Sequence, residues 1–190
     1  AIRLAVESTS EPGVMIPEAR EVLAGTQMTL PGAGKVEVIL SAEAIAARVR
    51  ELGTEISREY AGRNPLFVSI LKGGIVFLSD LIRSVSTPHE IDFLAVTSYG
   101  ARTTSSGRVR LLHDLSAEVR GRDVLLVEDI VDTGLTLRYL LDYLELRGPT
   151  TLRVCALLQK PTADPPAVVP DLVGFRIPNR FVIGYGMDLA

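Results

Sequence analysis

The segment that most constrains the fold of this chain is the apolar run from Val124 to Val127, together with the polar residues that follow it. Four consecutive apolar residues predict a strand that is buried on both faces, as in a parallel sheet. Two acids and a short loop come next, and an amphipathic helical pattern then begins. A tight loop between a strand and a helix N-terminus is an anion site, because free backbone N–H groups and the helix dipole point into it.

The acidic residues of this segment indicate which kind of anion it binds. Glu128 and Asp129 would repel a phosphate group unless they face sugar hydroxyls or a divalent cation that bridges to the ligand. Thr133 and Thr136 add hydroxyl donors, and Gly134 allows the backbone to approach a ligand closely. This combination predicts a site for a sugar phosphate with Mg²⁺.

A purely structural interpretation of the same loop is that Asp132 or Thr133 caps the following helix. A cap uses a single residue, however, whereas this loop supplies several polar side chains in one short string. The loop is not a Walker loop, because no G-x-x-x-x-G-K-[ST] motif occurs in the chain.

The rest of the chain predicts an α/β fold with a mostly parallel sheet, because strands and helices alternate. Ligands of such sheets bind beyond the carboxyl ends of the strands, where the polar clusters that follow the predicted strands are expected to fall. We predict an irregular extension over residues 1–35, with one short helix between Pro17 and Leu23, followed by a single domain over residues 36–190. Helices are expected at 41–62, at 75–83 and after Gly134, and strands at 66–71, 91–98, 109–112, 124–127, 151–158, 172–177 and 181–185.

Composition excludes several classes of protein. The net charge of −3 and the lack of a basic run argue against a nucleic-acid surface. The lone cysteine, Cys155, lies in an apolar run, which indicates a buried thiol and a reducing compartment, and hence a cytoplasmic location. No apolar run approaches ~18 residues, so no membrane span is expected. The first residues also lack the pattern of a signal peptide.

The string E-D-x-x-D-T-G-x-T at positions 128–136 resembles the phosphoribosyl-pyrophosphate motif of the type I phosphoribosyltransferases, and its details resemble the hypoxanthine-guanine branch. The resemblance covers about residues 36–190. It implies the type I phosphoribosyltransferase fold: a mostly parallel central sheet flanked by helices, with a small hood from the terminal segments, to which residues 160–190 contribute the base-binding part. It also implies purine salvage, in which hypoxanthine or guanine and 5-phosphoribosyl 1-pyrophosphate give IMP or GMP and pyrophosphate, with Mg²⁺ as cofactor.

The resemblance assigns the sugar-phosphate half of the site. Asp132 would be the general base near N7 of the purine. Lys72 and Gly73, in the strand-to-helix loop at 71–74, would hold pyrophosphate, and the Leu71–Lys72 peptide is expected to be cis. The phosphoribosyl group would be bound by Glu128, Asp129, Ile130, Val131, Asp132, Thr133, Gly134, Leu135 and Thr136.

The resemblance also assigns the base, the metal and a lid. Lys160 would donate to the 6-oxygen of the purine, Phe181 would stack on its ring, and Val182 would read its edge through backbone groups. Ser98 and Tyr99 would begin a mobile lid over residues 98–107, although an ordinary long hairpin loop fits the same residues. Mg²⁺ would be held by Glu128, Asp129 and Asp188.

In one respect the chain departs from the family pattern. Relatives normally continue past the aspartate at position 188 through a segment with an arginine that contacts pyrophosphate, whereas this sequence stops at Ala190. A chain that ended there would be expected to have weaker transferase activity.

Two other functions stay open at this stage. One is a phosphoribosyltransferase that prefers xanthine or adenine, which would share the phosphate loop but differ at Lys160 and Phe181. The other is a non-catalytic regulator that uses the same fold to bind nucleic acid, although the acidic composition argues against it. The family relationship implies a homodimer or homotetramer, and the sequence does not decide between them.

Overall fold

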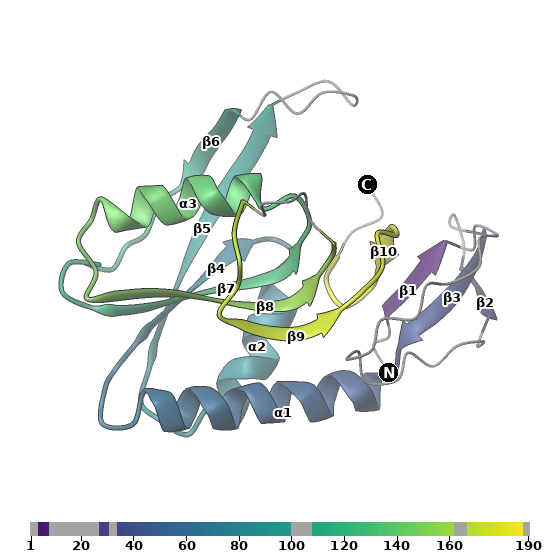
Figure 1. Ribbon diagram of the computed structural model, residues 1–190, viewed down its shortest axis with the longest axis horizontal. Coiled ribbons are helices and arrows are strands. Elements are labelled where there is room, and N and C mark those ends of the chain that lie inside the picture. The colour runs from purple at the N-terminus through teal and green to yellow at the C-terminus, as the bar shows by residue number, and fades with distance from the viewer. Residues whose placement is uncertain (1–3, 8–26, 31–33, 100–107, 162–166, 188–190) are drawn as a thin grey trace.

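The computed structural model describes residues 4–7, 27–30, 34–99, 108–161 and 167–187 of the chain, and its centre is a six-stranded sheet (Figure 1). The strand order is β6-β5-β4-β7-β8-β9. All neighbouring strands run parallel except β6, which pairs antiparallel to β5 at the edge. The strands are β4 (Leu66–Leu71), β5 (Glu90–Tyr99), β6 (Arg108–His113), β7 (Asp123–Val131), β8 (Thr151–Gln159) and β9 (Leu172–Arg176). The predicted mostly parallel α/β fold is confirmed.

Helices cover both faces of this sheet (Figure 1). Helices α1 (Ala42–Glu59) and α2 (Ile75–Ser84) pack on one face, and α3 (Leu135–Glu145) packs on the other. Adjacent strand residues divide between the two cores: Phe67 packs with α1 and α2, whereas Leu66 packs with α3. This alternation explains why most positions of the central strands are apolar. Among the described residues, none of the helices has the length and apolar character needed to cross a membrane.

The start of α1 follows the sequence signals closely. Ser41 is the N-cap, and its Oγ accepts a hydrogen bond of 3.1 Å from the backbone N–H of Ala44. The apolar positions of the helix, including Leu52 and Ile56, are fully buried. The helix ends at Glu59, shortly before Gly62, whose φ of 75° lies in the left-handed region that favours glycine.

A second, four-stranded antiparallel sheet lies beside the main one and forms the small hood (Figure 1). Its order is β10-β1-β3-β2, with β1 (Leu4–Glu7), β2 (Gln27–Leu30), β3 (Gly34–Leu40) and β10 (Val182–Ile183). Strand β1 therefore joins the start of the chain to its last strand. The hood combines segments that are more than 170 positions apart in the sequence, as the register Val6 opposite Val182 shows.

Several element boundaries differ from the sequence-based predictions. Strands β1 and β2 lie within the stretch predicted to be irregular, and β3 had not been predicted. Strand β2 pairs with the neighbouring β3, with Leu30 opposite Gly34, so this local pairing was missed, whereas β1 pairs with β3 and with the distant β10. The helix expected between Pro17 and Leu23 lies outside the described residues. The central strand β7 continues to Val131, where it still pairs with Gln159 of β8, so Glu128 and Asp129 belong to the strand rather than to the loop after it.

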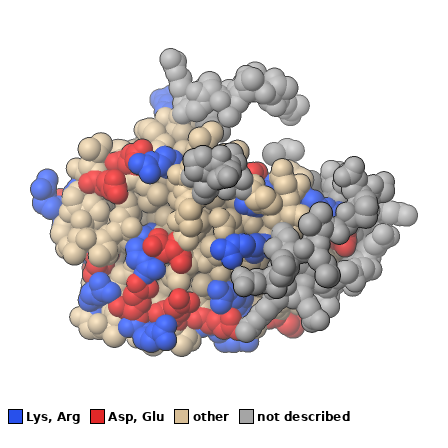
Figure 2. Space-filling model, in the orientation of Figure 1, with Lys and Arg blue, Asp and Glu red and all other residues tan. Residues whose placement is uncertain are grey.

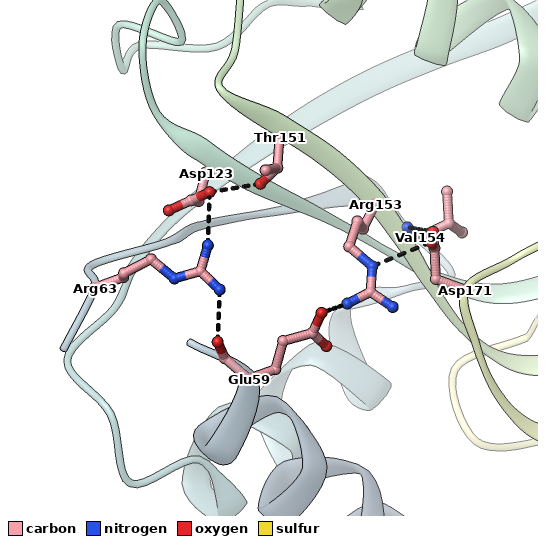
Figure 3. A network of polar contacts seen from close by, with 7 residues as sticks. All are labelled: Glu59, Arg63, Asp123, Thr151, Arg153, Val154 and Asp171. Atoms are coloured by element: carbon pink, nitrogen blue, oxygen red, sulfur yellow. Dashed lines mark hydrogen bonds and ion pairs between the residues drawn. The ribbon is translucent and has the colours of Figure 1, made fainter. Parts of the chain in front are cut away.

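The amino ends of the strands carry a network of ion pairs (Figure 3). Asp123, at the start of β7, accepts hydrogen bonds from Arg63 at 3.2 Å and from the Thr151 hydroxyl at 2.6 Å. Arg153 pairs with Glu59 of α1 and, at 3.1 Å, with Asp171. These contacts connect α1, β7, β8 and the start of β9 at the end of the sheet opposite the phosphate loop.

Candidate active site

Eight of the predicted site residues line one cavity at the carboxyl ends of β4, β7 and β8. Its volume is about 430 Å³. It receives residues from the loop after β4, the end of β7, the residue after β8, and the segment around β10. The lining residues are Lys72, Gly73, Asp129, Ile130, Asp132, Lys160, Phe181, Val182, Gly186 and Met187.

The phosphate loop adjoins this cavity, and its geometry is set by Gly134. Gly134 has φ 75° and is the N-cap of α3, and its carbonyl accepts the first helical hydrogen bond from the N–H of Arg138 at 2.8 Å. No side chain caps this helix N-terminus with a good hydrogen bond: the Oγ1 of Thr133 lies 3.5 Å from the N of Leu135. Thr136 lies in the first turn of the helix. The free N–H groups of this turn and the helix dipole are thus available to an anion.

Asp132 and Lys160 form the clearest functional contact in the cavity. The Nζ of Lys160 donates to Oδ2 of Asp132 at 2.9 Å. The side chain of Lys160 is 10% exposed and that of Asp132 is 54% exposed. The backbone N–H of Lys160 also donates to the carbonyl of Val131 at 2.9 Å, which holds the end of β8 against β7. Asp132 therefore uses its carboxylate to bind a lysine across the cavity and does not cap α3.

The fold shields the carboxyl groups of Glu128 and Asp129 from much of the solvent. Burial, and secondarily the charge of Asp129, raises the pKa of Glu128 well above its usual range. Burial also raises the pKa of Asp129, and a backbone hydrogen bond of 2.8 Å from Ile130 partly offsets this effect. The Oε2 atom of Glu128 is inaccessible to solvent and has no hydrogen-bond partner among the described residues. Such carboxylates favour a ligand that brings hydroxyl donors or a cation.

The loop after β4 approaches Asp129 so closely that only glycine fits. A Cβ atom on Gly73 would lie 2.1 Å from Oδ2 of Asp129, and one on Gly74 would lie 2.4 Å from Oγ of Ser69. The Leu71–Lys72 peptide bond is cis, as predicted. Lys72 and Gly73 line the cavity together with Asp129, so this loop and the Asp129 carboxylate face a common space.

One side of the cavity, where the base is predicted to bind, is formed by the segment around β10. Phe181 is 49% exposed, whereas the next residue, Val182, is buried. An aromatic ring that lies open at a cavity is available for stacking on a planar ligand. Lys160 and Asp132 line the same cavity and supply polar groups for the edge of such a ligand.

Not every predicted residue can be placed, and some lining residues were missed. Asp188 and most of the 98–107 segment lie outside the described residues. Ser98 and Tyr99 occupy the end of β5, opposite Val109 and Arg108. Gly186 and Met187 line the cavity although they had not been proposed as site residues, and the G-Y-G-x-D string that contains them was the available signal.

The described residues include no cluster of three or more His, Cys, Asp or Glu side chains arranged to hold a metal ion. Mg²⁺ does not require such a cluster, because it is commonly bound through one or two carboxylates together with substrate phosphates and water. The carboxylates of Asp129 and Asp132 in the cavity wall meet that lesser requirement.

Comparison with known proteins shows the family of this chain. The profile of the phosphoribosyl transferase domain matches residues 35–189. The hypoxanthine-guanine phosphoribosyltransferase of Mycobacterium avium is 50% identical over 157 residues, which cover 80% of this chain and 77% of that protein. The crystal structure of a hypoxanthine phosphoribosyltransferase from Staphylococcus aureus aligns with a TM-score of 0.72 and 38% identity, over 77% of this chain and 79% of that one.

Another relative is much longer than this chain. The bifunctional protein TilS/HprT of Listeria innocua is 47% identical over 154 residues, and the match covers 81% of this chain but only 24% of that protein. The chain thus spans about a quarter of that relative and most of the Mycobacterium avium protein.

Proposed function

This chain belongs to the phosphoribosyltransferase family, and we propose that it converts hypoxanthine or guanine and 5-phosphoribosyl 1-pyrophosphate to the nucleoside monophosphate and pyrophosphate. The observation that carries this proposal is the 2.9 Å contact between Lys160 and Asp132 within a cavity that also contains Phe181 and Lys72. The pair combines a donor-only cation with an acceptor carboxylate. The cation suits the 6-oxygen of a 6-oxopurine, and the carboxylate suits the N–H at N7 on the same edge of the ring system.

Each of these side chains has a defined role toward the base. The Lys160 ammonium donates to the 6-oxygen, and the open ring of Phe181 stacks on the purine. Asp132 accepts the proton from N7 as N9 bonds to C1′ of the ribose. The C1′–oxygen bond to pyrophosphate breaks in the same process, and its electron pair leaves with the pyrophosphate. Asp132 is thus the general base of the reaction.

The phosphoribosyl group occupies the loop between β7 and α3. The N–H groups of the first turn of α3, with the hydroxyls of Thr133 and Thr136, hold the 5′-phosphate. Glu128 and Asp129 accept hydrogen bonds from the ribose hydroxyls, which provide the donors that these buried acids lack. Positive charge develops on the ribose during transfer, and the same carboxylates stabilise it electrostatically.

The loop after β4 holds the leaving group. Lys72 and the backbone of Gly73 bind pyrophosphate at the wall of the cavity that Asp129 shares. Mg²⁺, when bound by Asp129, Glu128 and Asp188, would neutralise the charge of the pyrophosphate oxygens. Residues 98–107 would then close over the site and exclude water from the cationic ribose.

Surface charge supports a small-molecule enzyme over a nucleic-acid-binding regulator. Figure 2 shows Lys and Arg side chains interspersed with Asp and Glu over the visible face of the molecule. A nucleic-acid site would instead concentrate basic residues along one stripe. A homodimer or homotetramer, which light scattering would identify, and a cytoplasmic location remain part of the proposal.

A steady-state assay of hypoxanthine, guanine, xanthine and adenine, each with 5-phosphoribosyl 1-pyrophosphate and Mg²⁺, tests this function. We expect turnover with hypoxanthine and guanine that ceases when a chelator removes Mg²⁺. Preferential turnover of adenine would assign the chain to a different branch, and absence of turnover with all four bases would overturn the proposal.

A further inference from the structure

The segment 180–187 contributes four residues to the cavity wall, two near its start and two near its end. Phe181 and Val182 lie on the base side, whereas Gly186 and Met187 lie toward the loop after β4. Two side-chain contacts attach this segment to different parts of the molecule, and neither involves a residue of the proposed catalytic machinery.

The first anchor lies beside the base-binding residues. Arg180, directly before Phe181, pairs with Glu37 of β3 at 3.1 Å. The two side chains are only 28% and 27% exposed, so solvent screens the pair less than it would a fully exposed one. Val182 is held in addition by the pairing of β10 with β1. The position of Phe181 and Val182 thus depends on the hood.

The second anchor lies at the turn that ends the segment. Tyr185 and Gly186 have φ values of 53° and 93°, and hydrogen bonds of 3.2 and 3.0 Å between Gly184 and Met187 close a two-residue turn. A non-glycine residue in the left-handed region is uncommon. The Tyr185 ring is buried, and its hydroxyl donates to Oδ2 of Asp80 in α2 at 2.6 Å. This contact ties the turn to a helix of the main fold.

The turn at 184–187 packs against the Lys72–Gly73 loop, which is proposed to hold pyrophosphate. A Cβ atom on Gly186 would lie 3.0 Å from the carbonyl oxygen of Gly73 and 2.9 Å from Cγ2 of Val76. The backbone of the turn is therefore packed directly against the loop that carries Lys72 and against α2. A shift of the turn would alter the space in which the Lys72–Gly73 loop is held.

We propose that the two anchors are positioning devices for different substrates. The Glu37–Arg180 pair positions Phe181 and Val182 for the purine. The Asp80–Tyr185 hydrogen bond positions the turn at 184–187, and through it the Lys72–Gly73 loop, for pyrophosphate. This inference rests on the proposed function for the identity of the two ligands, and it assigns specificity to four residues that do not contact them.

Two conservative variants separate the anchors. Tyr185→Phe removes only the hydroxyl and keeps the buried ring, whereas Glu37→Gln removes the charge and keeps the side-chain length. We expect Tyr185→Phe to raise KM for 5-phosphoribosyl 1-pyrophosphate by about 10-fold and to leave KM for hypoxanthine within ~2-fold. Glu37→Gln should raise KM for hypoxanthine by about 10-fold and leave KM for 5-phosphoribosyl 1-pyrophosphate within ~2-fold. Small displacements of a positioning group have effects of this size or larger.

Arg83→Gln is the matched control for the second anchor. Arg83 pairs with Oδ1 of Asp80, while Tyr185 uses Oδ2, so this variant removes a charged partner of the same aspartate without touching the tyrosine bond. Its two KM values should match those of the unmutated protein. A purely structural role for the anchors predicts that Tyr185→Phe and Glu37→Gln lower thermal stability and change both KM values together, which would overturn the proposal.

Direct binding distinguishes this inference from the proposed function. Calorimetry with Mg²⁺–pyrophosphate and with GMP gives dissociation constants that do not depend on turnover. Weakened pyrophosphate binding in Tyr185→Phe, with unchanged pyrophosphate binding in Glu37→Gln, supports the inference even if the assay of the four bases fails. Equal weakening in both variants overturns it even if the unmutated protein is an active transferase.

Discussion

The carboxyl groups at the two ends of the six-stranded sheet differ in their hydrogen-bond partners. At the amino ends, Asp123 has two side-chain donors, and Asp171 accepts both from Arg153 and from the backbone N–H of Val154 at 2.8 Å (Figure 3). At the carboxyl ends, Glu128 is half-buried, and its solvent-inaccessible Oε2 atom has no hydrogen-bond partner among the described residues. The carboxylates of the first end are thus paired within the protein, whereas one carboxyl oxygen of the second end has no partner among the described residues.

One group at the amino end also lacks a partner. The hydroxyl of Tyr60 is buried without a hydrogen bond among the described residues, and burial, followed by the charge of Asp123, raises its pKa to about 12. A tyrosine with a raised pKa is neutral at pH 7, so burying the unpartnered Tyr60 hydroxyl costs far less free energy than burying a charge. The contrast between the ends therefore concerns carboxyl groups: those of Asp123 and Asp171 have side-chain donors, whereas the Oε2 atom of Glu128 has no partner among the described residues.

The largest expected effect concerns base choice at the carboxyl end. Lys160 has donors only, so it suits the 6-oxygen of hypoxanthine and opposes the 6-amino group of adenine. Opposed donors in a desolvated pocket give discrimination of about 10⁴-fold. We expect kcat/KM for hypoxanthine to exceed that for adenine by this order, and Lys160→Ala to lose much of the oxopurine activity. Comparable kcat/KM values for the two bases in the unmutated protein would contradict the role of Lys160.

The next largest effect is that of Asp132→Asn. Removing a positioned general base should lower kcat by about 10²–10⁴-fold. Binding of 5-phosphoribosyl 1-pyrophosphate, measured by calorimetry, should change little, because Asp132 does not cap the helix that holds the phosphate. A variant with nearly full kcat would show that the Asp132–Lys160 pair is merely structural.

A third prediction links function to stability through Glu128. Its raised pKa means that the folded protein holds a proton that the unfolded chain releases, so this group makes stability fall as pH rises above the ordinary carboxyl range. Glu128→Gln cannot ionise, and it should be more stable than the unmutated protein by about 1–3 kcal/mol at pH 8. Urea denaturation at pH 5 and pH 8 measures this difference, which should grow with pH.

The same variant should lose transferase activity, because Glu128 is assigned to the ribose hydroxyls. A stabilised, inactive protein would be direct evidence that the carboxyl end sacrifices stability for binding. If Glu128→Gln were less stable at both pH values, the Glu128 carboxylate would have hydrogen-bond partners in the folded protein in solution. The contrast between the two ends would then disappear.

The smallest effect is expected at the amino end. Arg153→Met keeps the aliphatic stem but removes the ion pairs with Glu59 and Asp171, whose side chains are 34% and 37% exposed. Solvent screening limits the loss to about 1 kcal/mol, or a decrease in Tm of ~2–4 °C. The kcat and KM values should be unchanged, since this network lies at the opposite end of the sheet. A change in KM would show that the two ends are coupled.

Local patterns were sufficient for the parts of the site that lie within single strand-to-loop segments. The apolar run before Glu128, the glycine at position 134 and the Lys72–Gly73–Gly74 loop each have a local physical cause, and the structure contains the predicted strand, turn and helix at these places. Resemblance to the family added the cis peptide at Leu71–Lys72, which local chemistry does not require. The roles of these residues remain predictions.

The hood shows where local patterns fail. Strands β1 and β2 have no periodicity that distinguishes them from an irregular extension, and β10 has only two residues. The pairing of β2 with the neighbouring β3 is local and was missed, whereas β1 pairs with β10 across more than 170 positions, which leaves no signal within any window of the sequence. Glu37 and Asp80 were missed for the same reason, because their partners Arg180 and Tyr185 lie more than 100 residues away.

The sequence by itself determined the class of fold, the strand-to-helix loops that can bind phosphate, and the family to which they belong, because each depends on residues that are neighbours along the chain. Only the tertiary structure decided that Lys160 meets Asp132, that Gly73 lies against Asp129, and that the oxygen of Glu128 has no partner among the described residues. These facts depend on how parallel strands from distant segments align, and that register is settled by the packing of the whole core.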